Sequence, residues 1–189
     1  MPPFSENRDT ILNQLKNSEE AAGTLIAGLS DAQLNWQPND GRSWSIWQCL
    51  DHLARTNRVY GQAMLEAIAH PGPYTKATKA ITPGWFGRWF ITRMEPSAET
   101  RYNTVKKVMP GPAGNGQAVM REFADSHAEA RHVVASWEQA DLNRLRFQNP
   151  FVPLLRFTVG TGLMIINAHD RRHLSQAERV KQSAGYPAA

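Results

Sequence analysis

The stretch WSIWQCLDHLARTNRVYGQAMLEAIA, residues 44–69, has the clearest pattern in the chain. Its apolar residues recur at helical spacings, and Gly61 is the one glycine or proline among them. These apolar residues are Ile46, Leu50, Leu53, Tyr60, Met64 and Ile68. At 1.5 Å per residue such a helix spans roughly 40 Å, which is long enough for one member of a helix bundle. We expect Ser43 to cap its start and the sequence His70-Pro-Gly-Pro to end it.

Three further segments show the same helical period. They cover residues 5–29, with Ser5 as the expected cap, residues 117–145 and residues 158–182. Proline and glycine are frequent between residues 71 and 116, which predicts a long crossover with at most short helical pieces. The chain has no segment with the strict alternation of a half-buried strand. The sequence therefore predicts an all-α four-helix bundle, with the crossover between its second and third helices and one domain over residues 1–189.

The composition excludes several classes of protein. With 41% hydrophobic and 20% charged residues, the chain has the composition of a folded domain. The net charge is +4 and the basic residues are scattered, so we expect no nucleic-acid partner. No apolar run approaches the roughly 20 residues of a transmembrane helix, and the N-terminus lacks the apolar stretch of a signal peptide. Together with a single cysteine, Cys49, these features predict a cytoplasmic protein without a transmembrane segment.

Three of the six histidines are candidate metal ligands. His169 and His173 are four residues apart, which places both imidazoles on one face of the last helix. His52 lies on the helix over residues 44–69, one turn from Cys49 and from Thr56, whose small side chains leave room between the helices. Three neutral imidazoles with open coordination positions suit zinc, nickel or iron. The alternatives are two exposed histidines on the last helix and a hydrogen-bonded core histidine at position 52.

Motifs for other chemistries are absent. The chain contains no phosphate-binding glycine loop, no dinucleotide fingerprint and no G-x-S-x-G nucleophile elbow. Asp170 stands where the zinc-protease motif H-E-x-x-H needs its glutamate. The remaining histidines are weaker candidates: His70 precedes a turn and is expected to be exposed, while His127 and His132 lack a partner four residues away. His127 nevertheless falls on the apolar row of its helix.

Two motifs together resemble the DinB/YfiT-like family. Trp44-Ser-Ile-Trp-Gln-Cys-Leu50-Asp-His52-Leu53 is similar to the family pattern W-S-x-x-x-x-L-x-H-L, and His169-Asp-Arg-Arg-His173-Leu-Ser-Gln176 is similar to its H-x-x-x-H-x-x-Q. The resemblance covers essentially the whole chain. It implies an up-down-down-up four-helix bundle, often a homodimer, with a divalent metal held by His52, His169 and His173. Gln176 then orients a ligand or a water molecule, or is an ordinary surface glutamine.

The resemblance leaves three functions open. A metal-dependent hydrolase would use the ion to activate water. A thiol-dependent S-transferase or isomerase would use it to deprotonate a low-molecular-weight thiol. The third alternative is a metal-binding stress protein without catalysis. For either enzyme we expect a small-molecule substrate.

Two other features of the sequence have several interpretations. The aromatic segment at residues 85–91 can cover the metal pocket, form a dimer contact, lie on a membrane surface or simply pack on the core, which we favour. Arg55, Arg171 and Arg172 lie near the histidines in sequence and can clamp an anionic substrate. We expect them instead to lie on a solvated helix face, because the two arginines at 171 and 172 point away from the histidine row.

Overall fold

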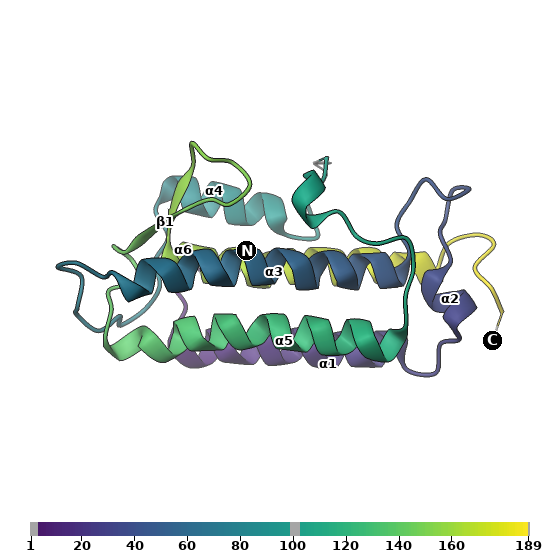
Figure 1. Ribbon diagram of the computed structural model, residues 1–189, viewed down its shortest axis with the longest axis horizontal. Helices are drawn as coiled ribbons and strands as arrows, with labels where there is room; N and C mark the ends of the chain where they lie inside the picture. Colours follow the sequence, from purple (N-terminus) through teal and green to yellow (C-terminus); the bar gives the residue numbers. More distant parts are fainter. Residues whose placement is uncertain (1–3, 99–102, 189) are drawn as a thin grey trace.

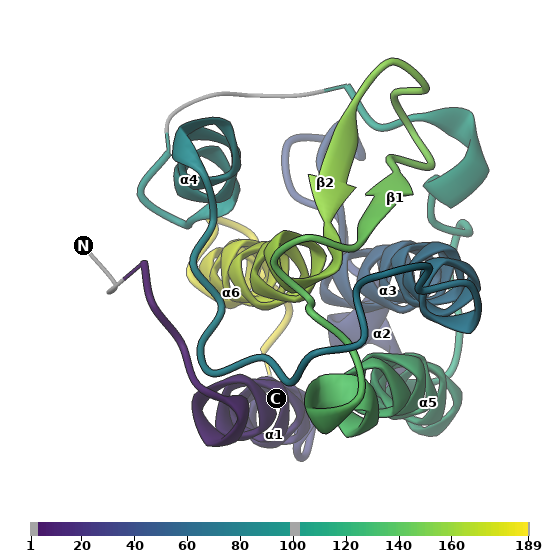
Figure 2. The same cartoon turned by 90° about the vertical axis from the view of Figure 1, so that its left-hand side faces the viewer.

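Four long helices form the body of the computed structural model, which describes residues 4–98 and 103–188. They are α1 (Arg8–Ile26), α3 (Ile46–Ala69), α5 (Gly116–Ala135) and α6 (Val159–Lys181). Viewed end-on, α3 and α6 form one layer and α1 and α5 the other (Figure 2). α1 and α6 run in one direction, and α3 and α5 in the opposite one (Figure 1). The predicted all-α four-helix bundle with an up-down-down-up order is therefore confirmed.

The helix boundaries differ from the sequence prediction where capping side chains decide them. α1 begins after Asn7, whose side chain accepts the Thr10 amide, and not after Ser5. α3 begins after Ser45, because Ser45 and Gln48 form a reciprocal capping box that Ser43 lacks. α5 ends at Ala135 instead of Leu145, and a short 3₁₀-helix, η2 (Ser136–Glu138), follows it. In η2 the Trp137 carbonyl accepts the Thr78 amide, so this turn is bonded to the crossover.

Several short elements surround the bundle. The crossover contains α4 (Trp85–Met94) and a 3₁₀-helix, η1 (Lys106–Val108), and α2 (Asp31–Asn35) follows α1. The strands β1 (Arg146–Gln148) and β2 (Arg156–Thr158) form an antiparallel hairpin that we did not predict. They are too short for alternation to be visible in the sequence. α4 and the hairpin lie on the outer side of the α3–α6 layer (Figure 2).

The helices approach each other closely where the sequence places small residues. At Gly61, an added Cβ would lie 2.7 Å from the Glu129 Cβ, so glycine allows α5 to pack against α3. The buried residues of α3 and α6 include Leu53, Met64 and Ile166. Within the described residues, none of the helices combines the length and the apolar character that crossing a membrane requires.

Candidate metal centre

His52 on α3 and His169 and His173 on α6 lie together between the two helices. One ring nitrogen of each residue lies within 4.8 Å of the others. The ring centroids are 5.2 Å apart for His52 and His169, 4.8 Å for His52 and His173, and 4.5 Å for His169 and His173. We call these residues the histidine triad. The structure thus brings together the three predicted ligands, which are far apart in sequence.

The crossover fixes the ring of His52. His52 Nδ1 lies 2.8 Å from the carbonyl oxygen of Val108, and a carbonyl only accepts, so Nδ1 carries the proton and donates. Two neighbouring side chains hold the crossover in place: Gln48 donates to the Gly111 carbonyl at 3.1 Å, and Asp51 accepts the Gly111 amide at 2.8 Å. The Nε2 atom of His52 therefore keeps its lone pair for a ligand.

Gln176 has the same effect on His173. Its Oε1 atom lies 2.9 Å from His173 Nδ1, which donates to it and leaves Nε2 unprotonated. The two residues are three positions apart on α6, so they lie on adjacent turns of one face. This contact is consistent with the prediction that Gln176 orients a neighbouring group. A role of Gln176 in metal binding stays a prediction.

His169 is the unusual member of the triad. Its Nδ1 atom is buried and has no hydrogen-bond partner among the described residues. A buried polar atom without a partner costs free energy in a folded protein, so such atoms call for an explanation. A metal ion shared with the other two imidazoles would give this ring a partner.

The environment keeps all three imidazoles neutral near pH 7. Burial lowers the pKa of His52 and lowers the pKa of His169 well below its ordinary value. Burial and the nearby His52 lower the pKa of His173 to about 3. A neutral imidazole is the form that binds a metal ion, so no proton has to leave before binding.

Trp44 covers one side of the triad. Its ring lies 4.8 Å from that of His52 and stacks at 5.7 Å on that of His173. The tryptophan directly precedes the capping residue Ser45, so the start of α3 places it. It shields two rings of the triad from solvent on that side.

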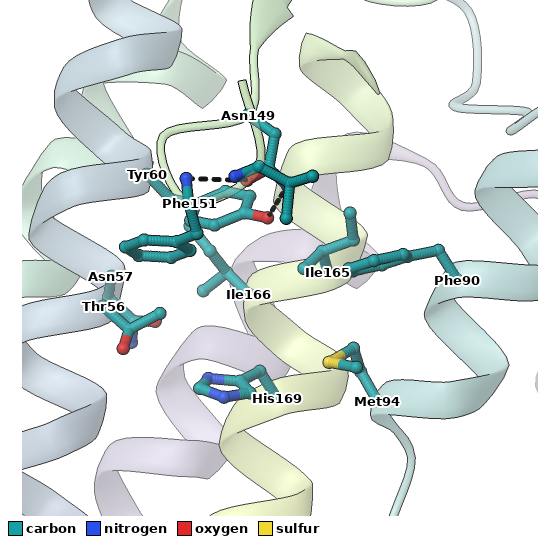
Figure 3. A pocket seen from close by; sticks show the side chains of 11 residues that line it. Thr56, Asn57, Tyr60, Phe90, Met94, Asn149, Phe151, Ile165, Ile166 and His169 are labelled. Carbon is teal, nitrogen blue, oxygen red and sulfur yellow. Dashed lines mark hydrogen bonds between the residues drawn. The ribbon is translucent and has the colours of Figure 1, made fainter. Parts of the chain in front are cut away.

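A cavity of about 100 Å³ adjoins the triad, and His169 of the triad forms part of its wall (Figure 3). Phe90 of the aromatic segment contributes to its wall, as does Met94 further along α4. Covering a pocket next to the predicted site was one interpretation of this segment. Phe86 and Phe90 also pack on Phe157 of β2, as core packing predicts. Trp85 is 81% exposed and takes part in neither arrangement.

Arg171 and Arg172 of α6 make structural contacts, which corrects our expectation that they lie on a solvated helix face. Arg171 forms a two-pronged ion pair with Glu95, with N–O distances of 2.6 and 3.1 Å. Arg172 donates to the carbonyls of Arg93, Glu95 and Ala98 at 3.1 to 3.2 Å. Together they hold the end of α4 against α6. Arg55 is half-exposed and pairs with Asp51, as expected for a solvated helix face.

Sequence reasoning missed a second buried histidine cluster, centred on His127 of α5. His127 Nδ1 lies 2.8 Å from Glu19 of α1, and Nε2 lies 2.9 Å from Asp170 of α6. The other oxygen of Asp170 accepts from Asn57 of α3 at 2.9 Å, so the cluster joins all four long helices. We call these four residues the His127 cluster. The position of His127 on the apolar row of its helix was the one feature of the sequence that indicated its burial.

The electrostatics of the His127 cluster are opposite to those of the triad. Burial alone would lower the pKa of His127, but its hydrogen bonds to Asp170 and Glu19 outweigh burial and raise the pKa to about 9. Burial opposes ionisation of Glu19, yet the hydrogen bonds from His127 and Arg131 lower its pKa. His127 is therefore a cation near pH 7 and has no free lone pair for a metal ion.

Comparisons with known proteins identify the family and support the fold. A model of the DinB superfamily matches residues 14–177. The uncharacterised protein YuaE of Bacillus subtilis is 26% identical over 188 residues, which cover 96% of this chain and 97% of that protein. The structure of YfiT from Bacillus subtilis superposes with a TM-score of 0.58 at 15% identity, covering 95% of this chain and 89% of that one. YfiT is described as a probable metal-dependent hydrolase with an unusual four-helix bundle topology.

Proposed function

The chain belongs to the DinB superfamily, and we propose that it is a metal-dependent hydrolase whose divalent ion is held by His52, His169 and His173. The observation that carries the proposal is the convergence of three neutral imidazoles, one of which has a buried nitrogen without a partner in the described part of the chain. The description of YfiT as a probable metal-dependent hydrolase supports the same reaction class.

The donor set fits a divalent transition metal. Imidazole nitrogens suit zinc, nickel and iron(II), and three protein ligands leave a coordination position open for substrate or water. When bound, such an ion supplies Lewis acidity and lowers the pKa of a water molecule to about 7.

The residues around the triad prepare it for this role. The Val108 carbonyl and Gln176 fix the protonated nitrogens of His52 and His173, so their free nitrogens face away from these partners. Trp44 shields the triad on one side, and Phe90 covers the adjoining cavity. A site that excludes bulk water strengthens the electrostatic interactions within it.

Metal content tests the binding site directly. Untagged protein purified without chelator or nickel resin is expected to contain about one equivalent of metal by elemental mass spectrometry. His52→Ala, His169→Ala and His173→Ala are each expected to lose it while circular dichroism still shows a folded bundle. His132→Ala, on an exposed helix position, is the matched control and should keep the metal. If the wild type stays empty after incubation with zinc, nickel and iron(II), the proposal fails.

Hydrolysis is tested with the metal-loaded protein and a panel of ester, amide and lactone substrates. Turnover that requires the metal and no thiol supports the hydrolase. Turnover that appears only with an added low-molecular-weight thiol would favour the S-transferase instead. The chain's own Cys49 does not supply a thiolate, because burial raises its pKa to about 12. Metal binding without turnover would favour the non-catalytic protein.

We further propose that the substrate is a small molecule and that the protein is a homodimer, as the family resemblance implies. Sedimentation equilibrium measures the oligomeric state, and a mass of one chain over the micromolar range would contradict the dimer. A cytoplasmic location is likewise proposed, and cell fractionation tests it.

A further inference from the structure

The cavity beside the triad has walls that are mostly apolar. Phe90, Met94, Phe151, Val152, Ile165 and Ile166 line it, and they come from α4, α6 and the loop between the two strands (Figure 3). The remaining lining residues are Thr56, Asn57 and Tyr60 of α3, Asn149 and His169. The described residues that line the cavity include no aspartate, glutamate, lysine or arginine.

Two polar atoms on the α3 side of this cavity have no partner. Thr56 is 7% exposed and Asn57 is fully buried, yet Thr56 Oγ1 and Asn57 Oδ1 form no hydrogen bond with any residue that the structure describes. A threonine in a helix commonly bonds a carbonyl one turn back, so an unbonded hydroxyl is notable. Two unsatisfied oxygens on neighbouring residues that line one small cavity are a cost in stability that a ligand bonded to them would remove.

The His127 cluster fixes the direction of the Asn57 amide. Asn57 Nδ2 donates to Asp170, whose other oxygen accepts from His127. If the amide were reversed, its oxygen would face the Asp170 carboxylate and repel it. The Asn57 oxygen is therefore held on the side away from Asp170, as an acceptor without a donor.

Tyr60 adds a donor to the same cavity. Its hydroxyl accepts from Asn149 Nδ2 at 2.8 Å. Asn149 cannot turn its oxygen to Tyr60, because that oxygen already accepts the backbone amides of Phe151 and Val152 at 2.8 and 2.9 Å. The Tyr60 hydroxyl therefore keeps its own proton available for an acceptor.

We propose that this cavity is the substrate-binding subsite of the metal centre and that it takes an uncharged, largely apolar group carrying a hydroxyl or an N–H donor. The donor binds Asn57 Oδ1 and Thr56 Oγ1, while the apolar walls hold the rest of the group. A cavity of about 100 Å³ is of the same order as the roughly 150 Å³ cavities that bind benzene, so the group is about the size of a single ring. In the metal-free protein, the described lining residues include no lysine or arginine that could pair with a carboxylate or a phosphate, which disfavours either group at this position. That this group belongs to a substrate rests on the proposed function.

The first test uses three ring-sized probes on metal-free protein. Phenol offers a donor, toluene has the same size without one, and benzoate carries a charge. Titrations followed by amide NMR are expected to show phenol binding in the millimolar range, with shifts at residues 56, 57, 165 and 166. Toluene is expected to bind about fivefold to tenfold more weakly, and benzoate more weakly still. Equal affinity for phenol and toluene, or shifts confined to other residues, would overturn the proposal.

The second test changes the polar atom and keeps the shape. Thr56→Val replaces a hydroxyl by a methyl group and is expected to weaken phenol binding about fivefold, with toluene binding unchanged. Thr56→Ser keeps the hydroxyl and should retain the preference for phenol. Because the hydroxyl has no partner in the free protein, Thr56→Val should not lower the melting temperature, whereas a structural threonine would. Thr92→Val, an exposed helical threonine, is the matched control and should leave every affinity unchanged. An unchanged phenol affinity in Thr56→Val would contradict the proposal.

The subsite and the metal centre can fail separately. Phenol binding is measured without metal, so an empty metal site does not affect it. Thr56→Val leaves the three histidines intact and should keep its metal, so turnover of a hydroxyl-bearing substrate should fall through a higher KM at unchanged metal content.

Discussion

His127 and the histidine triad are buried in the same bundle but have opposite partners. Each ring nitrogen of His127 donates to a carboxylate, whereas in the ranges that the structure describes none of His52, His169 and His173 forms a hydrogen bond with a carboxylate. The first environment stabilises the cation and the second stabilises the neutral ring.

This difference separates a cluster that stabilises the fold from a site that we propose binds a metal ion. The His127 cluster has its polar groups paired across all four long helices except for one oxygen of Asn57, so it ties the bundle together. The triad leaves lone pairs free and one nitrogen without a partner, an arrangement that costs stability until a ligand binds. Substitutions in the two groups should therefore have opposite consequences.

Asp170→Asn should cause the largest loss of stability. It removes the charge that His127 and Asn57 share, and breaking one partner of a buried ion pair costs about 3–5 kcal/mol. Urea unfolding measures this free energy. Asp125→Asn, on an exposed position of α5, should change it by less than about 0.5 kcal/mol. A loss below about 1 kcal/mol for Asp170→Asn would mean that the cluster does not hold the bundle together.

The pH dependence of unfolding is expected to show the His127 cation. A raised folded-state pKa means that its stabilisation is complete below the ordinary histidine pKa of about 6.5 and is lost as the pH rises towards 9. The free energy of unfolding should fall by at most about 1.4 kcal/mol per pH unit in this window. A Cys49→Ala background removes the contribution of the thiol, whose pKa is raised to about 12. A flat profile between pH 6.5 and 9 would show that His127 is not protonated in the fold.

Zinc should stabilise the protein through the triad. A ligand at one hundred times its Kd adds about 2.7 kcal/mol to the free energy of unfolding when it binds only the folded state. His169→Ala should abolish this gain, measured by urea unfolding with and without zinc, while His132→Ala should retain it. Equal stabilisation of all three proteins would place the zinc elsewhere.

Gln176→Ala removes the hydrogen bond to His173 and is expected to have an effect of intermediate size on metal affinity. Loss of the partner that orients a ligand commonly weakens metal binding by about 10-fold to 100-fold. Competition with a zinc chelator measures the affinity. Gln176→Glu keeps an acceptor for His173 Nδ1 and should restore it. A surface glutamine without a role would give the same affinity in all three proteins.

The smallest effect is expected for His169→Leu in metal-free protein. The substitution removes a buried nitrogen that lacks a partner, so the free energy of unfolding should change by less than about 1 kcal/mol, or rise. The same experiment on His127→Leu should give a large loss, because Asp170 and Glu19 then face an apolar side chain. A similar loss in both variants would remove the distinction between the two groups.

Periodicity and motif spacing were sufficient for the part of the fold that is local. Each of α3 and α6 has its own rows of apolar residues, and His169 and His173 lie four residues apart on one helix. These are properties of single helices. The convergence of His52 with them was implied by a family resemblance, because helical periodicity does not determine which faces meet.

Non-local contacts explain what the sequence did not reveal. The partners of His127 come from two other helices, and the fixed tautomer of His52 depends on a backbone carbonyl. The 3₁₀-helix after α5 is bonded to the crossover through Thr78 and Trp137. None of these contacts produces a pattern within one segment of the chain.

The bond between His52 and the Val108 carbonyl has a consequence for protein engineering. The acceptor is a main-chain atom 56 positions away, so the bond itself does not depend on which side chain occupies position 108. Side chains along the crossover can be exchanged as long as its path over α3 is kept, but not at Gly114, where an added Cβ would overlap the Trp47 ring. Inserting or deleting a residue between Val108 and the anchor at Gly111 would move the carbonyl and release the imidazole, although every histidine would still be present.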